Sequence, residues 1–227
     1  NSSLTFTTAN WDTPQTVTVN GADDSIIDGT ITSIATVAVD DANSDNDFDA
    51  VADQTVSVDT TDDDVAGFTI VELDGATEVD ESGTTDTFTV VLDAQPSDNV
   101  VIAMSSSDIG EATISGTISF TPANWDTPQT VTVTGVDENT IDGDQTSTIT
   151  ITIVDSISDS DFSNVADQTV SVVTTDDDAA GFTIEETEGS TEVDESGTTD
   201  TFTVVLYSQP TSDVVLTITS DDTGEVT

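Results

Sequence analysis

The sequence predicts an all-β protein built from tandem antiparallel β-sandwiches, and three observations lead to this prediction. The first is an internal repeat, because the chain of 227 residues matches itself at an offset of 114, with 71 of 113 aligned positions identical. The second is a series of short segments in which apolar and polar residues alternate with a period of two, as in half-buried strands. The third is that no ten-residue segment carries a helical stripe, while Gly, Asp, Asn and Pro clusters separate the alternating segments.

Five alternating segments are the clearest strand candidates within one repeat. They are rich in Thr, Val and Ile, whose branched side chains suit a pleated sheet with one polar face. About seven or eight such strands in roughly 110 residues is typical of an antiparallel β-sandwich. In chain order, the five segments are residues 87–92, 100–104, 130–134, 148–153 and 168–172.

An Asp-rich string marks the predicted junction between sandwiches, because it occurs at residues 60–68 and again at residues 174–182. We therefore expect residues 65–178 to form one complete repeat. Residues 1–64 are then the C-terminal part of a preceding sandwich, and residues 179–227 are the N-terminal part of a following one. The two parts together contain 113 residues, about one repeat. Two interpretations remain open, namely a portion of a longer array, or a subunit whose split sandwich is completed head to tail by the next subunit.

The composition excludes many functions. The chain has 47 Asp and Glu residues and no Lys, Arg, His or Cys, which gives a formal charge of -47. Nucleic acids, nucleotides and anionic membranes are therefore not expected as partners, and disulfides and the usual zinc or copper ligands are excluded. Insertion into a membrane is not expected either, since no apolar run approaches about 20 residues. Of the common catalytic chemistries only a carboxylate pair such as Glu78 and Glu81 remains, and tandem copies favour a scaffold, so we expect no enzyme activity.

The unbalanced charge itself predicts bound cations. Two carboxylates about 8 Å apart repel by about 0.5 kcal/mol even in bulk water, and no cationic side chain offsets the many such pairs. Such a chain is either disordered or completed by inorganic cations. Its abundance of strand-forming residues favours the second outcome. Because only oxygen ligands are available, hard cations such as Ca²⁺ are the plausible partners.

Several strings resemble tandem Calx-beta domains, the calcium-binding β-sandwiches of sodium–calcium exchangers, an integrin subunit and large bacterial surface proteins. The strings are residues 176–186, 193–197 and the acidic loop 136–142, and the stretch 120–133 resembles the version found in bacterial adhesins. The resemblance extends through both repeats. It implies an Ig-like or Calx-beta-like sandwich with a calcium cluster at one pole.

Carried onto this sequence, the resemblance implies a set of calcium ligands from the acidic loop, the Asp triplet and two further positions. Asp142 stands where the family often has Glu, which shortens the reach of that ligand. In the complete repeat the implied ligands are Glu72, Asp108, Asp137, Glu138, Asp142, Asp176, Asp177 and Asp178. In the flanking parts they are Asp23, Asp24, Asp28, Asp62, Asp63, Asp64, Glu186 and Asp222.

Two other signals are interpreted structurally. The acidic loop that starts at Asp45 is not an EF-hand, because Ala50 and Val56 stand where that loop needs Gly and Glu. It and its counterpart at residues 159–161 remain candidates for a weak additional ion. Trp125 lies in a context shared with the other repeat, and we expect it to be a partly buried cap on the sandwich edge rather than a sugar-stacking platform.

The expected function is that of an extracellular structural repeat stabilised by calcium, in a bacterial surface fibre, an adhesin stalk or a matrix filament. Its expected partners are copies of itself, either in tandem or head to tail. One alternative is a ligand-binding adhesin module that recognises a glycan or protein at the cell surface. Another is a halophilic acidic surface without a specific calcium site.

Overall fold

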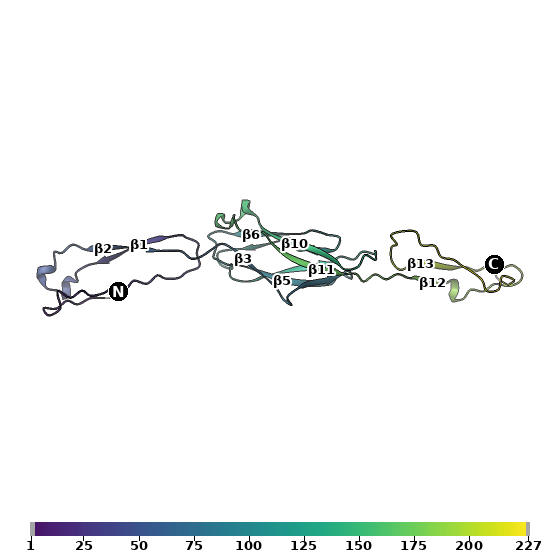
Figure 1. Cartoon of the computed structure of the whole chain (residues 1–227), viewed down its shortest axis with the longest axis horizontal. Helices are drawn as coiled ribbons and strands as arrows, with labels where there is room; N and C mark the ends of the chain where they lie inside the picture. The colour runs from purple at the N-terminus through teal and green to yellow at the C-terminus, as the bar shows by residue number, and fades with distance from the viewer. Residues whose placement is uncertain (1–2, 226–227) are drawn as a thin grey trace. The chain divides into compact units, whose positions relative to one another are not determined.

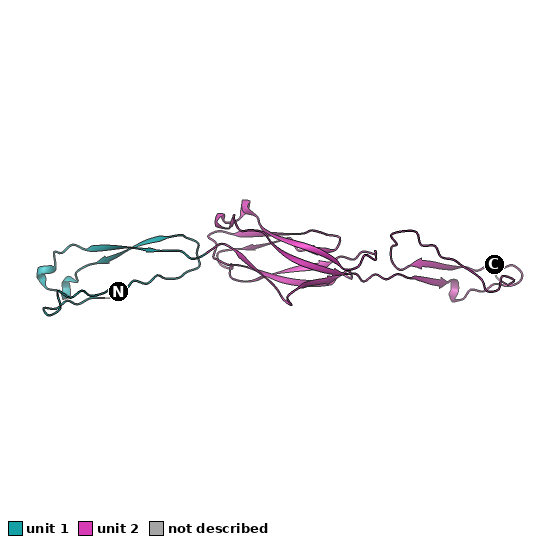
Figure 2. Ribbon diagram, in the orientation of Figure 1, with its two compact units in different colours: residues 1–64 teal, residues 65–227 magenta. Residues whose placement is uncertain are grey.

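A computed structural model describes residues 3–225 and divides the chain into two compact units, residues 1–64 and residues 65–227 (Figure 2). The described residues form thirteen β-strands and five short 3-10 helices, and they contain no α-helix. The prediction of an all-β protein is therefore confirmed. Among these residues there is no helix long and apolar enough to cross a membrane. We refer to residues 65–178 as the complete repeat, residues 1–64 as the N-terminal partial repeat and residues 179–227 as the C-terminal partial repeat.

The complete repeat is a β-sandwich of two sheets, and all of its residues are described (Figure 1). One sheet has four antiparallel strands, in the order β3 (Phe68–Glu72), β5 (Thr85–Leu92), β9 (Gln129–Gly135) and β7 (Ala112–Ile114). The other sheet has five strands, in the order β4 (Thr77–Asp80), β11 (Gln168–Thr175), β10 (Gln145–Ile153), β6 (Val100–Ser106) and β8 (Thr117–Phe120). Each of the five strand candidates lies within a strand of this sandwich.

One ladder of the sandwich is parallel. β4 runs beside β11 in the same direction, with Thr77 opposite Val172, whereas the other ladders of the complete repeat are antiparallel. The chain passes from β3 in one sheet to β4 in the other through a turn that contains Gly75 at φ 82°. Alternation of apolar and polar residues gives no strand direction, so the sequence did not indicate this ladder.

The core of the complete repeat lies between the two sheets. Its strands alternate buried and more exposed residues, as in β10, where Ile149 and Ile151 are fully buried and Thr148 is exposed. The largest apolar side chains with no exposed surface are Phe88, Phe120, Phe162, Ile102, Ile149 and Ile151. Burial of such side chains is the main favourable contribution to folding.

Each partial repeat contains one short hairpin of strands. In the N-terminal partial repeat, β1 (Ile31–Val37) pairs with β2 (Gln54–Thr60) in the register that β10 and β11 use. In the C-terminal partial repeat, β12 (Phe182–Glu186) pairs with β13 (Phe202–Leu206) in the register of β3 and β5. The 3-10 helices are η1 (Asp41–Asn43), η2 (Asn46–Phe48), η3 (Asp155–Ile157), η4 (Ser160–Phe162) and η5 (Thr187–Gly189).

Candidate metal centre

Glu81 lies in a tight turn directly after β4. The turn is closed by hydrogen bonds from the Gly83 amide to the Asp80 carbonyl (3.2 Å) and from the Ser82 amide to Asp80 Oδ1 (3.0 Å). Gly83 has φ 86°, a conformation that favours glycine. The Glu81 amide donates to the Thr175 carbonyl at the end of β11 (3.2 Å), which ties the turn to the neighbouring strand.

The end of β9 presses against this turn. A Cβ atom at Gly135 would lie 2.0 Å from the Asp80 carbonyl oxygen and 3.3 Å from Val79 Cγ2, so only glycine fits there. The Gly135 amide donates to the Thr84 carbonyl (3.0 Å) on the other side of the turn. Glu81, which lies in this turn, has no exposed surface.

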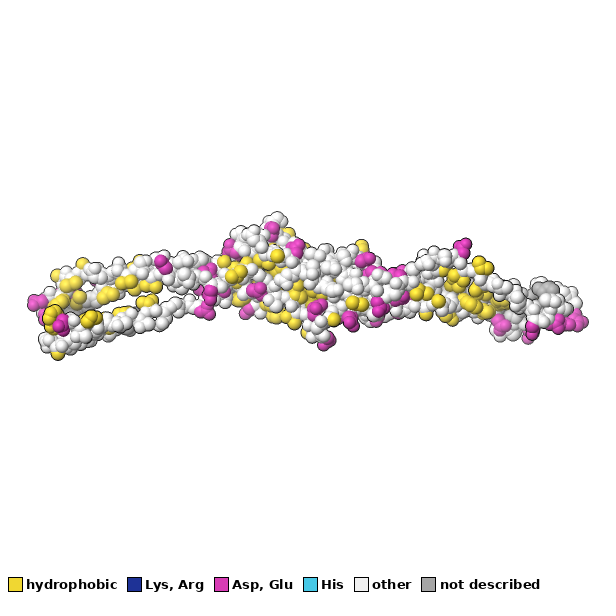
Figure 3. Space-filling view, viewed as in Figure 1, with side chains coloured by type: hydrophobic (Ala, Val, Ile, Leu, Met, Phe, Trp, Pro, Cys, Tyr) yellow, Lys and Arg dark blue, Asp and Glu magenta, His cyan; other side chains and the backbone are white. Residues whose placement is uncertain are grey.

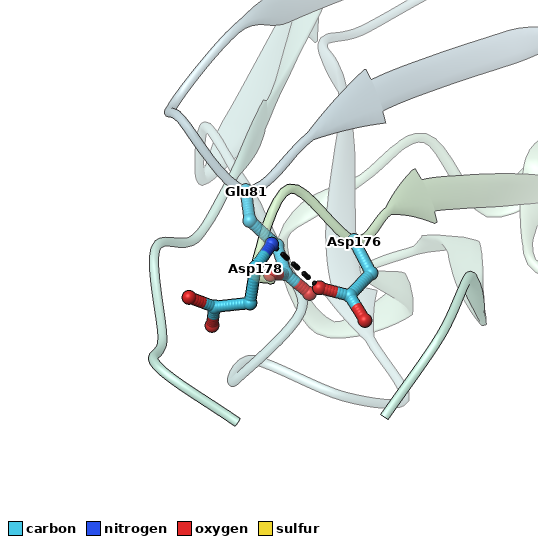
Figure 4. Close-up of side chains that lie close together, drawn as sticks. All are labelled: Glu81, Asp176 and Asp178. Atoms are coloured by element: carbon cyan, nitrogen blue, oxygen red, sulfur yellow. Dashed lines mark hydrogen bonds between the residues drawn. The ribbon is translucent and has the colours of Figure 1, made fainter. Parts of the chain in front are cut away.

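Two acidic segments meet Glu81 at this pole of the sandwich. The Asp triplet, residues 176–178, follows β11, and its first member is held by hydrogen bonds. Asp176 Oδ1 accepts from the Asp178 amide (2.8 Å), the dashed line in Figure 4, and Asp176 Oδ2 accepts from the Gly143 amide (2.8 Å). The acidic loop, residues 136–142, follows β9.

Glu81 belongs to two groups of carboxylates. Glu81, Asp176 and Asp178 each offer an oxygen within 4.8 Å of the others, and Figure 4 shows these three side chains at the ends of β4 and β11. Glu81, Glu138 and Asp142 form a second group by the same distance. We call the five residues together the polar carboxylate cluster.

The centre of this cluster lacks hydrogen-bond donors. Both oxygens of Glu81, Asp178 Oδ2 and Glu111 Oε2 are buried without a hydrogen-bond partner. Burial, and then the negative charges of Asp176 and Glu138, raise the pKa of Glu81 to about 7 from its ordinary value of 4.5. Burial and nearby carboxylates raise the pKa of Glu111 as well. An ionised Glu81 is therefore unfavourable unless a positive charge accompanies it.

The residues present fit a calcium ion. Ca²⁺ binds oxygen ligands at about 2.3–2.6 Å, so two of its ligands are separated by at most about 5 Å. The 4.8 Å limit within each group meets this condition. Every side-chain donor in the cluster is a carboxylate oxygen, which suits a hard cation and not zinc or copper.

The structure brings together four of the eight residues predicted as ligands in the complete repeat, namely Glu138, Asp142, Asp176 and Asp178. The other four lie outside both groups. Asp137 and Asp177 are exposed, and Asp108 is exposed with its Oδ1 accepting from the Gly110 amide (2.9 Å). Glu72 Oε1 accepts instead from Thr77 Oγ1 (2.8 Å).

In the N-terminal partial repeat the predicted ligands lie together around a pocket. Asp62 Oδ2 accepts from the Gly29 amide (2.8 Å), as Asp176 does from Gly143. Backbone hydrogen bonds from Asp64, Gly29 and Asp28 lower the pKa of Asp62, whereas burial and neighbouring carboxylates raise the pKa of Asp64. The pocket is lined by all six predicted residues, Asp23, Asp24, Asp28, Asp62, Asp63 and Asp64, together with Ala22, Gly29, Ile31, Thr60 and Thr61.

The two predicted ligands of the C-terminal partial repeat are both exposed. Glu186 Oε1 accepts from Thr191 Oγ1 (3.2 Å), and Asp222 Oδ1 accepts from the Gly224 amide (2.9 Å). These bonds match those of Glu72 and Asp108 in the complete repeat.

The second candidate for a weak additional ion, residues 159–161, has a structural role instead. Asp159 is 5% exposed, and its Oδ2 accepts from the Ser97 amide (2.6 Å), the Ser97 hydroxyl (2.9 Å) and the Asp98 amide (2.9 Å). Its Oδ1 accepts from the Asp161 amide (3.0 Å). Burial acts to raise the pKa of Asp159, but these bonds together outweigh it and the pKa is lowered. Both oxygens are therefore occupied by donors.

The predicted ligand set omitted Glu81 and Glu111. Glu81 belongs to the Asp-Glu-Ser-Gly string at residues 80–83, which recurs at residues 194–197 and forms part of the family resemblance. From the sequence, Glu81 was a candidate only for a catalytic carboxylate pair with Glu78. The signal that could have found it is the acidic second residue of this string, which is identical in the two repeats.

No family model and no curated protein matches the chain. Among solved structures it is similar to the apo form of the Calx CBD1 domain, with 18% identity and a TM-score of 0.35 over 49% of this chain and 98% of that chain. It is also similar to domains 1–6 of the surface layer protein SbsC, with 18% identity and a TM-score of 0.35 over 74% of this chain and 28% of that one. A third similar structure is SSP-19, an MSP-domain protein-like family member in Caenorhabditis elegans. It has 18% identity and a TM-score of 0.30 over 44% of this chain and 92% of that chain. These likenesses are weak, and the β-sandwich rests on the two sheets described above.

Proposed function

We propose that this chain is a calcium-stabilised structural repeat of an extracellular bacterial fibre, adhesin stalk or matrix filament, without enzyme activity. The observation that carries the proposal is Glu81, which is fully buried, has no hydrogen-bond partner on either oxygen and is shared by two carboxylate groups. A bound calcium ion supplies the positive charge and the coordination that these oxygens lack.

The cluster residues come from three places in the chain, and an ion held by either group would join Glu81 to one of the other two places. Glu81 follows β4, the acidic loop follows β9, and the Asp triplet follows β11. Because Glu81 belongs to both groups, it would supply a ligand oxygen to an ion held by either one. Without a cation the same residues repel one another at a buried position.

Residues of the C-terminal partial repeat contact the segments that carry the cluster. The Ser208 hydroxyl donates to Asp178 Oδ1 (2.9 Å), and the Gln209 amide donates to the Asn139 carbonyl (2.6 Å). Ordering the triplet and the acidic loop would therefore also restrict the chain that leads into the next repeat. This is the property that a stiff shaft of repeats requires.

Thermal unfolding of the full chain by calorimetry tests the proposal. Calcium at 100 times its Kd is expected to stabilise the fold by about 2.7 kcal/mol per site, and a chelator is expected to remove that gain. Glu81→Gln should lose most of the calcium response, whereas Glu78→Gln, on the exposed side of β4, should keep it. Identical melting with calcium and with chelator would contradict the proposal, and full restoration by molar NaCl would favour the halophilic alternative.

The adhesin alternative has no supporting observation among the described residues. Trp125 is half-buried, and its carbonyl accepts from the Leu92 amide (3.2 Å), as expected for a cap on the sandwich edge. Trp11 is 71% exposed, but it belongs to a partial repeat that lacks the counterpart of Leu92.

A further inference from the structure

Ser208, in the loop after β13, contacts one member of the polar carboxylate cluster. Its hydroxyl donates to Asp178 Oδ1 (2.9 Å). The other oxygen of the same carboxylate, Asp178 Oδ2, is buried and has no hydrogen-bond partner. Asp178 therefore has one oxygen held by a donor from the C-terminal partial repeat and one oxygen left for a cation shared with Glu81 and Asp176.

The Ser208 hydroxyl has two acceptors within reach, because it lies 3.0 Å from the Ala179 carbonyl oxygen as well. A serine hydroxyl carries one proton and can donate to one of them at a time. Hydrogen bonds to an ionised carboxylate are about twice as strong as those between neutral groups. The bond to Asp178 is therefore the favoured one while that carboxylate is ionised.

The loop that carries Ser208 is tied down on both sides of it. The Tyr207 amide donates to the Gly181 carbonyl (3.0 Å), and a Cβ atom at Gly181 would lie 2.5 Å from Tyr207 Cδ2, so the ring lies directly against this glycine. On the other side, the Gln209 amide donates to the Asn139 carbonyl of the acidic loop (2.6 Å). Ser208 therefore keeps its place beside the Asp triplet through its neighbours.

The cluster depends on neutral donors to hold its carboxylates. Figure 3 shows Asp and Glu side chains and no Lys or Arg on the surface of the complete repeat, in keeping with a sequence that has no cationic side chain. Asp176 is held by two backbone amides, those of Gly143 and Asp178. Ser208 serves the carboxylate of Asp178 as these amides serve that of Asp176.

The hydroxyl at position 208 is not a property of every repeat. The strings at residues 86–92 and 200–206 are identical, and the two sequences differ directly after them. The counterpart of Ser208, 114 positions earlier, is Ala94, and the counterpart of Asp178 is Asp64. Alanine has no hydroxyl, so the bond from Ser208 to Asp178 has no equivalent from Ala94 to Asp64.

We propose that Ser208 is a positioning residue for the calcium ligand Asp178 and that it couples the ion in the complete repeat to the chain of the next repeat. This inference rests on the proposed function, because it names a residue outside the complete repeat that tunes the same site. Partners that orient a metal ligand typically contribute 10–100-fold to metal affinity. By linkage, a contact that strengthens calcium binding is itself strengthened by calcium to the same extent.

Calcium titration calorimetry of the full chain tests the first half of the inference. The binding event to follow is the one that Glu81→Gln removes. Ser208→Ala should weaken that event by about 10-fold or more. Ser208→Thr, which retains the hydroxyl, should bind calcium as the wild type does, and so should the matched control Ser212→Ala at an exposed position. Melting in chelator should be the same for the wild type and these three variants at positions 208 and 212, which separates lost affinity from lost folding.

Amide hydrogen exchange measured by NMR tests the reciprocal half. Calcium should slow exchange of the Gln209 amide by about 5-fold or more in the wild type, because its bond to Asn139 adjoins the Ser208 contact. The same amide should not respond to calcium in Ser208→Ala. The control is the Thr187 amide, which donates to the Thr201 carbonyl within the C-terminal partial repeat (3.3 Å) and should not respond in either protein.

The outcomes separate this inference from the proposed function. If Glu81→Gln removes a calcium-binding event but Ser208→Ala leaves its affinity unchanged, the positioning role fails and the proposed function stands. An equal loss of affinity in Ser208→Thr and Ser208→Ala would also overturn the role of the hydroxyl. If the wild type shows no calcium binding that depends on Glu81, the proposed function fails and the inference fails with it.

Discussion

The N-terminal partial repeat and residues 115–178 of the complete repeat have closely related sequences but different environments. Val17 and Val19 are 54% and 56% exposed, whereas their counterparts Val131 and Val133 are fully buried in β9. Residues 15–21, the counterpart of β9, form no strand although they keep the same Thr and Val alternation. Strand formation at these positions therefore depends on partners from the other segment of a sandwich, because sheet pairing is non-local.

The acidic residues of the two regions show the same dependence. Asp62 and Asp176 make equivalent hydrogen bonds to the glycine of their acidic loops. Among the described residues, a buried glutamate, Glu81, lies within 4.8 Å of the aspartate group of the complete repeat, and the pocket of the N-terminal partial repeat is lined by no glutamate. The aspartate–glycine hydrogen bond therefore forms within the N-terminal partial repeat alone. The group that contains the buried Glu81 needs residues from both 65–114 and 115–178.

The largest expected difference between the regions is in their cores. Phe88→Ala should lower the free energy of unfolding of the complete repeat by about 3–5 kcal/mol, because Phe88 has no exposed surface. Phe202→Ala, the matched change at an exposed position, should leave that free energy unchanged in dilute solution. Urea unfolding followed by Trp125 fluorescence in a Trp11→Phe background measures both. Equal losses for the two variants would mean that Phe202 is already buried in the single chain.

The next effect is the pH dependence of the metal-free protein. The pKa of Glu81 is raised to about 7, mainly by burial, so the folded state holds this proton more tightly than the unfolded state. The resulting stability is fully present below about pH 4.5 and is lost as the pH rises through about 7, by at most about 1.4 kcal/mol per pH unit for one group. Chemical unfolding in chelator between pH 4.5 and 8 measures it.

Glu81→Gln should remove this dependence and Glu78→Gln should retain it. Calcium should reverse the trend, since deprotonated oxygens are the ligands. A metal-free wild-type protein whose stability is flat across this range would contradict the assignment of Glu81 as a buried, unpartnered acid.

A smaller effect is expected where β9 meets the turn. Gly135→Ala would place a methyl group 2.0 Å from the Asp80 carbonyl and should destabilise the complete repeat by about 1–3 kcal/mol and weaken calcium binding. Gly21→Ala is the matched control, because its Cβ would meet only Thr60 Cγ2 at 3.7 Å. Thermal melts and calcium titration calorimetry compare the two variants, and normal calcium affinity in Gly135→Ala would show that the turn position does not control the cluster.

The smallest effect is expected at Asp159. Asp159→Asn should cost about 1–2 kcal/mol, because the charged acceptor for Ser97, Asp98 and Asp161 is lost. Its pKa is lowered in the fold, so its contribution is present above about pH 4 and lost as the pH falls through the folded pKa. Asp45→Asn should have no effect on unfolding of dilute protein. Urea unfolding at pH 7 and pH 3 checks both variants, and a loss of equal size at pH 3 would contradict the role of the ionised carboxylate.

The sequence predicted the strands better than their partners. Alternation placed the five candidate segments correctly, because it reports which side chains can be buried. It could not show the parallel pairing of β4 with β11, since neither strand direction nor sheet order is encoded by period two.

The same limit applies to the candidate metal centre. The Asp triplet and the acidic loop were predicted as ligands from the resemblance to Calx-beta domains, and four of their residues lie in the cluster. Glu81 was not predicted as a ligand, because a turn of Asp, Glu, Ser and Gly has the composition of an exposed surface. Glu81 is nevertheless fully buried, and its turn contacts Gly135 and β11, which are more than 50 residues away in the chain.

The parallel ladder between β4 and β11 has a mechanical consequence. β4 lies near the start of the complete repeat and β11 ends it, with Thr77–Asp80 beside Val172 to Thr175. Tension that pulls the two ends of the repeat apart draws these strands in opposite directions along their own axes. The hydrogen bonds of the ladder then resist as a group in shear instead of opening one after another. A shaft built from such sandwiches would stretch little before its strands slide, which suits a protein that must transmit load.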